Sequence, residues 1–128
     1  MITSGLEDYL EIIYNSINEN ENLKAVDIAH KMNVSRASVS EALIRLSDKD
    51  LIIYEGRKGI KLTPQGTKEA QRITKKHKIL NEFFNKILGA DKETSSENAC
   101  KIEHVIDESI IEKINSFTKY CIKNNIHN

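Results

Sequence analysis

The chain of 128 residues lacks the features that mark membrane and secreted proteins. No apolar run approaches the roughly 20 residues that a membrane-spanning helix needs, so we expect no membrane partner. The first residues contain no basic stretch followed by an apolar one, which argues against a secretory signal. Only two cysteines are present, Cys100 and Cys121, which are too few for a disulfide framework. These absences predict a cytoplasmic protein with reduced thiols.

A net charge is also lacking, because 19 Lys and Arg residues balance 19 Asp and Glu residues. This balance argues against a uniformly basic nucleic-acid binder, but the charge is unevenly distributed. Residues 51–78 contain eight basic and two acidic residues, a local charge of +6, whereas residues 1–50 contain five basic and nine acidic residues. A local basic patch attracts phosphate whatever the total charge is. The alternative is a solvated Lys-rich helix.

Helical periodicity dominates the chain and predicts six helices joined by short connections. The start signals are a capping box at Ser4 and Glu7, an N-cap at Ser35 and a proline at the first helical position, Pro64. The expected helices cover Ser4 to about residue 17, Ala25–Met32, Ser35 to about Asp48, Pro64–Leu88, Ser95–Ile106 and Glu108–Cys121. Two short strands, Leu51–Tyr54 and Ile60–Leu62, flank a turn with two glycines. The expected fold class is mainly α with a small β-hairpin.

The second and third helices, joined by a tight turn, are typical of a helix-turn-helix, and the hairpin would be its wing. We expect Val26 and Val34 to pack inward in this module. The N-terminus of the third helix is small or polar enough to enter the major groove, and Arg36 suits a bidentate contact to guanine. The expected DNA-binding residues are Ser35, Arg36, Ala37, Ser38, Ser40, Arg57 and Lys58. The alternative is a helical protein-interaction module with an unrelated hairpin.

Potential metal ligands occur in three distant segments. They are Asp8, Glu11, His77, Cys100, Glu103 and His104. The first two are three residues apart and the last three have i, i+3, i+4 spacing, so each set is expected on one face of a helix. Three carboxylates, two imidazoles and one thiolate suit a divalent first-row metal ion at high coordination number. The simpler explanations are solvated acids at a helix start, a hydrogen-bonded core histidine and a small buried cysteine.

Five stretches, in this order, resemble the diphtheria-toxin-repressor family of metal-dependent regulators, and within it the short manganese transport regulators. They are EDYLEIIY (7–14), VDIAHKMNVSRASVSEALIRL (26–46), LIIYEGRKGIKLTPQG (51–66), KKHKILNEFF (75–84) and ACKIEHVID (99–107). The last stretch is especially specific, because the metal helix of this family has the form C-x-x-E-H or E-x-x-E-H. The resemblance covers nearly the whole chain and matches all six candidate ligands to ligand positions of the family.

The resemblance implies a homodimeric, metal-dependent transcriptional repressor. Residues 1–71 would form the winged helix-turn-helix DNA-binding domain, and residues 72–128 a helical dimerisation and metal-binding domain without the SH3-like domain of larger members. The two recognition helices would lie one DNA turn apart, roughly 34 Å, on a palindromic operator in double-stranded DNA. The regulated genes would be those of metal transport. One or two Mn(II) or Fe(II) ions per subunit are expected.

The ligand set departs from both branches of the family. Asp8 is the manganese-type residue at its position, whereas Cys100 is the iron-type residue at its own, so the metal stays open between manganese and iron. Two rival functions are a metal-independent winged-helix DNA-binding protein and a hydrolytic metalloenzyme. The wing and the lack of an open catalytic motif argue against an enzyme.

Overall fold

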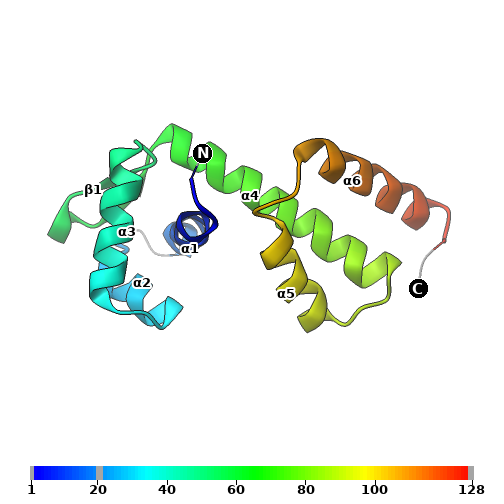
Figure 1. The fold of residues 1–128 in the computed structure, drawn as a ribbon, viewed down its shortest axis with the longest axis horizontal. Helices are drawn as coiled ribbons and strands as arrows, with labels where there is room; N and C mark the ends of the chain where they lie inside the picture. Colours follow the sequence, from blue (N-terminus) through cyan, green and yellow to red (C-terminus); the bar gives the residue numbers. More distant parts are fainter. Residues whose placement is uncertain (1, 20–21, 127–128) are drawn as a thin grey trace. The chain divides into compact units, whose positions relative to one another are not determined.

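A computed structural model describes residues 2–19 and 22–126, apart from the side chain of Arg57. The chain divides into two compact units, Met1–Gln71 and Arg72–Asn128, and the boundary between them falls inside the long helix α4 (Figure 1). Among the described residues, no helix combines the length and the apolar character that crossing a bilayer requires. The fold is mainly helical with one two-stranded antiparallel sheet, which confirms the predicted fold class.

The first unit contains three helices, a hairpin and the start of α4. Its elements are α1 (Ser4–Glu19), α2 (Ala25–Met32), α3 (Arg36–Asp48), β1 (Ile52–Tyr54), the 3-10 turn η1 (Gly56–Lys58), β2 (Ile60–Leu62) and α4 (Pro64–Glu82). Strand β1 pairs with β2 so that Ile52 lies opposite Leu62 and Tyr54 opposite Ile60. Helix α3 packs against both α2 and β1, which makes the hairpin a wing beside the recognition helix (Figure 1).

Local signals explain why α2 and α3 end and begin where they do. Asn33 adopts the left-handed conformation that commonly terminates a helix, and its backbone N–H donates to carbonyls of the last turn of α2. Ser35 then accepts a hydrogen bond from the Ser38 N–H at 3.1 Å, which caps α3. Both helices have the predicted bounds. At α1 the prediction was one residue off, since Thr3 rather than Ser4 accepts the hydrogen bond from the Leu6 N–H.

One continuous apolar core holds the first unit together. Its largest fully buried side chains come from α1, the connection between α1 and α2, α2, α3 and β1, and they are Leu10, Ile13, Leu23, Ile28, Val39, Leu43, Leu46 and Ile52. Burying one such side chain contributes about 1.5–3 kcal/mol relative to leaving it exposed. Two expected members are not in this core: Val26 is 45% exposed and Val34 is 38% exposed. Within α2, Ile28 and Ala29 are the residues buried in this core, and Val26 lies outside it.

Two glycines allow backbone segments of this unit to approach closely. Gly59 follows η1 with a φ of 91°, in the region that favours glycine, and a Cβ there would lie 3.0 Å from the Leu23 carbonyl oxygen. Gly66, in the first turn of α4, leaves no room for a Cβ, which would overlap the Leu51 carbonyl oxygen. The wing and the start of α4 are therefore held tightly against the core.

The second unit contains the rest of α4, the π-helical turn η2 (Phe83–Ile87), α5 (Lys92–Ile102) and α6 (Glu108–Lys123). Both α5 and α6 pack against η2, and the small core consists of Ile79, Leu80, Ala99 and Ile111. The predicted fourth helix thus ends in a π-turn, in which the Leu88 N–H donates to the Phe83 carbonyl at 3.2 Å. Helix α5 begins three residues earlier than predicted, because Asp91 caps it, and it ends four residues earlier than predicted, at Ile102.

Candidate metal centre and DNA-binding surface

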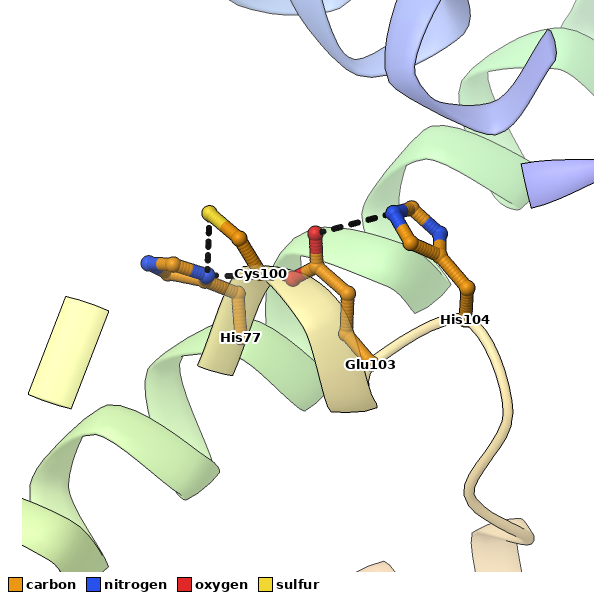
Figure 2. Close-up of polar contacts among 4 residues, drawn as sticks. All are labelled: His77, Cys100, Glu103 and His104. Carbon is orange, nitrogen blue, oxygen red and sulfur yellow. Dashed lines mark hydrogen bonds and ion pairs between the residues drawn. The ribbon is translucent and has the colours of Figure 1, made fainter. Parts of the chain in front are cut away.

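Ligand-type side chains of the second unit converge at the C-terminal end of α5. His77 comes from α4, Cys100 from the last turn of α5, Glu103 from the C-cap of α5 and His104 from the turn that follows. Figure 2 shows the Glu103 carboxylate between the two imidazole rings, with the Cys100 sulfur next to His77. Of the three residues predicted on one helical face, Cys100 lies within α5, which ends at Ile102, whereas Glu103 is its C-cap and His104 lies in the turn that follows.

The distances place three of these groups within reach of one ion. The Nδ1 atom of His77 lies 3.0 Å from Glu103 Oε2 and 3.7 Å from Cys100 Sγ. One ligand atom from each of the three residues lies within 4.8 Å of the other two. On the other side of the carboxylate, His104 Nε2 is 3.6 Å from Glu103 Oε1.

The surroundings of the Glu103 carboxylate show that a cation fits here. Its side chain is buried, with the residue only 1% exposed, and its Oε1 atom accepts no hydrogen bond from any described residue. A buried carboxylate oxygen without a donor is costly unless a positive charge or a donor reaches it. Oxygen, nitrogen and sulfur ligands together suit divalent first-row metals. The residues present therefore fit a divalent cation.

Asp8 and Glu11, the two other predicted ligands, belong to the first unit. They lie one helical turn apart on α1, with Asp8 exposed and Glu11 partly buried. Their spacing places them on one side of that helix, as expected. Their contribution to a metal site stays a prediction from the sequence.

The predicted DNA-binding residues of α3 lie at its exposed start. Arg36 and Ala37 are exposed in the first turn, and Ser40 is partly buried. The other two serines have a structural task, because the Ser35 hydroxyl caps α3 and also donates to the Ser38 hydroxyl at 2.9 Å. Of this set, Arg36 has the length and the donors for reading a base edge.

The tip of the wing is formed by η1. The Lys58 ammonium is exposed and lies 3.8 Å from the Glu55 carboxylate, a loose surface pair that phosphate can replace at small cost. The Arg57 side chain, also predicted to contact DNA, lies outside the described part of the structure. The role of both residues in binding DNA stays a prediction.

One residue next to the metal centre was missed by the sequence analysis. Lys76 is only 6% exposed and donates a hydrogen bond from Nζ to the Ile106 carbonyl at 2.6 Å. Lysine is almost never buried without a partner, but nothing in the local sequence marks this one. Its only signal is its place beside His77 on the same helix.

The winged helix-turn-helix and the cluster of ligands define a DNA-binding regulator with a metal centre. The N-terminal DNA-binding domain of iron-dependent repressors matches residues 1–60, and the metal-binding and dimerisation domain of the same repressors matches residues 63–127. The chain belongs to this family, the diphtheria-toxin-repressor family of metal-dependent transcriptional regulators, whose members are not enzymes. The matched domains indicate DNA and a second copy of the chain as partners.

Individual relatives agree with this assignment. The uncharacterised HTH-type transcriptional regulator MJ0568 of Methanocaldococcus jannaschii is 37% identical over 117 residues, which cover 91% of this chain and 94% of that protein. The HTH-type transcriptional regulator MntR of Geobacillus thermodenitrificans is 32% identical, covering 94% of this chain and 84% of MntR. The structure of the manganese regulator SloR aligns with a TM-score of 0.79 at 31% identity, covering 90% of this chain. The chain spans about half of SloR, 54% of its length.

Proposed function

We propose that this protein is a homodimeric repressor that binds a palindromic operator when Mn(II) or Fe(II) is bound, and that it controls genes of metal transport in the cytoplasm. The family supports metal-dependent repression. The observation that carries the metal proposal is the buried Glu103 carboxylate, with one oxygen lacking a hydrogen-bond donor among the described residues and with His77 and Cys100 at its side.

The six proposed ligands are Asp8, Glu11, His77, Cys100, Glu103 and His104. A divalent cation, when bound, supplies the positive charge that lets carboxylates and a thiolate share one site. Five or six ligands favour octahedral Mn(II) or Fe(II) over tetrahedral Zn(II). Manganese is supported by SloR, a manganese regulator at 31% identity, and by the carboxylate of Asp8. Iron is supported by the softer thiolate of Cys100.

In this proposal, ligands from both units couple metal binding to DNA binding. The carboxylates of Asp8 and Glu11, on α1 of the DNA-binding unit, and that of Glu103 repel one another when no cation is bound. The arrangement in which they converge is then favoured only with metal, and this is also the arrangement that binds the operator. A ligand that binds one arrangement preferentially shifts the population toward it.

The test is DNA binding as a function of metal concentration. A binding sequence is first selected from a random-sequence pool with the protein in Mn(II). A fluorescently labelled duplex of that sequence is then titrated with the protein, and binding is measured by anisotropy in chelator, in Mn(II) and in anaerobic Fe(II). We expect the metal to tighten binding about 5–150-fold, the usual range of allosteric coupling. Equal DNA affinity in chelator and in saturating metal would refute the proposal and favour a metal-independent DNA-binding protein.

Histidine variants assign the effect to the site. His77→Ala and His104→Ala are each expected to abolish the metal response, because each removes a proposed ligand. His30→Ala is the matched control, since His30 is exposed on α2 in the first unit. A full metal response in both ligand variants would show that the ion binds elsewhere.

A further inference from the structure

The turn that carries two of the proposed ligands, residues 103–107, joins the end of α5 to the start of α6. Helix α5 ends at Ile102, and α6 begins at Glu108. Within the turn, the Glu103 N–H still donates to the Ala99 carbonyl at 2.9 Å, and the Ile106 N–H donates to the Ile102 carbonyl at 3.1 Å. These bonds tie the turn to the end of α5, and its contacts with α4 determine how it lies against that helix.

The far end of the turn is held by α4 through Lys76. The Lys76 ammonium reaches the Ile106 carbonyl at 2.6 Å, and the lysine is 6% exposed. One helical turn earlier on α4, Arg72 Nη1 lies 3.6 Å from Glu108 Oε1 at the start of α6. Two cationic side chains of one helix thus contact consecutive parts of the connection between α5 and α6.

The neighbour of Lys76 on α4 is the ligand His77. Consecutive residues of a helix point about 100° apart, so α4 presents His77 to the Glu103 carboxylate and Lys76 to the Ile106 carbonyl. Helix α4 therefore contacts both the Glu103 side chain and the backbone carbonyl of Ile106, three residues later. This arrangement fixes the turn relative to the histidine that it must face.

We propose that Lys76 is a positioning residue of the metal centre: its hydrogen bond to the Ile106 carbonyl holds the 103–107 turn so that the Glu103 carboxylate lies between His77 and His104. The proposal rests on the metal site proposed above. It also makes a prediction whose sign is unusual. Lys76 carries a positive charge near a cation site, so a purely electrostatic role would make its removal tighten metal binding. A positioning role makes its removal weaken metal binding.

The test compares Lys76→Met with Lys75→Met. Both variants remove one positive charge from the same turn of α4, but Lys75 is exposed, and methionine at position 76 keeps most of the buried aliphatic volume. Affinity for Mn(II) is measured in the absence of DNA by competition with a fluorescent chelator. We expect Lys76→Met to bind Mn(II) about 10–100-fold more weakly, the loss typical when a residue that orients metal ligands is replaced. Lys75→Met is expected to match the wild type.

Lys76→Arg supplies the rescue, because a guanidinium of similar length can donate to the same carbonyl, and its affinity is expected to lie close to the wild-type value. Far-UV circular dichroism verifies that each variant is folded. If Lys76→Met is unfolded, Lys76→Gln, which retains a polar end, replaces it under the same criterion. Unchanged or tighter Mn(II) binding in the folded variant overturns the positioning role. Absence of binding of both Mn(II) and anaerobic Fe(II) by the wild-type protein would instead overturn the proposed function itself.

Discussion

At the level of single side chains, Arg36 and Lys58 are expected to contribute to DNA binding in different ways. Arg36 is exposed in the first turn of α3, where a guanidinium can donate two hydrogen bonds to a guanine edge. We predict that Arg36→Ala weakens operator binding by about 1–3 kcal/mol and relaxes the preference at one base pair.

Lys58 is at the tip of the wing, so Lys58→Ala should weaken binding to all sequences and reduce the salt dependence by about one phosphate contact.

The measurement is anisotropy on the selected duplex and on its single-base variants, at saturating metal and several salt concentrations. Lys119→Ala is the control, because Lys119 is exposed on α6 of the other unit. If Arg36→Ala discriminated among the bases as sharply as the wild type, base reading by Arg36 would be wrong. An unchanged salt slope in Lys58→Ala would contradict its phosphate contact.

At the level of a helix, the start of α5 depends on Asp91. Its carboxylate accepts a hydrogen bond from the Thr94 N–H at 2.7 Å. This backbone hydrogen bond is the main reason that the pKa of Asp91 lies below its ordinary value of 3.8, with a smaller contribution from the Thr94 side chain. A carboxyl group whose pKa is lower in the folded state stabilises the fold above its unfolded pKa. That contribution is lost as the pH falls through the folded pKa.

We predict that Asp91→Ala lowers the melting temperature near neutral pH, because α5 loses its cap. The difference from the wild type should shrink as the pH falls below the ordinary value of 3.8 and through the lower folded pKa, where the wild-type carboxyl group becomes protonated. Thermal melts followed by far-UV circular dichroism over a pH series measure this difference. Asp91→Asn is the control, because asparagine also caps helices but does not titrate. A difference between Asp91→Ala and the wild type that is independent of pH would contradict the role of the charge.

Helix boundaries could be predicted where a short-range signal sets them. Asn33 and Ser35 end α2 and begin α3 through hydrogen bonds to residues three or four positions away, so both helices have the expected bounds. The bounds of α5 were missed because Ser95 was taken as the cap, whereas Asp91 makes the capping bond. The π-turn η2 was also missed. Its residues have ordinary helical character, so no local signal distinguishes it from an α-helix. Bonds of the i→i+5 type are rare. This turn packs against both α5 and α6.

At the level of the whole molecule, the second unit exposes an apolar groove that suits a second copy of the chain. The groove has a volume of about 290 Å³ and is lined by Phe84, Leu88, Ala90, Thr94, Ser95, Asn98 and Ile102. Leu88, one of the lining residues, is 59% exposed. Residues 63–127 match a dimerisation domain, and symmetric dimers bury the same patch from both subunits. We therefore infer that the groove is part of the dimer interface.

We predict that Leu88→Glu converts the dimer into a monomer at micromolar concentration, because a carboxylate would be buried in an apolar contact. The mass in solution is measured by size-exclusion chromatography with light scattering. Val105→Glu is the control, since Val105 is also an exposed apolar residue but does not line the groove. A Leu88→Glu protein that remained fully dimeric would place the interface elsewhere.

The order of the helices and the wing could be predicted from the linear chain, because they depend on periodicity, caps and spacing over a few residues. The same short spacings indicated the residue types of the candidate metal centre. The meeting of His77 with Cys100 and Glu103 could not be deduced from spacing, since it joins segments more than 20 residues apart. Only the resemblance to a known family indicated it. Neither indicated that Lys76 is buried or that Glu103 Oε1 accepts no hydrogen bond from the described residues. Both depend on how α4 packs against the connection between α5 and α6, and such packing is set by contacts that no local sequence signal encodes.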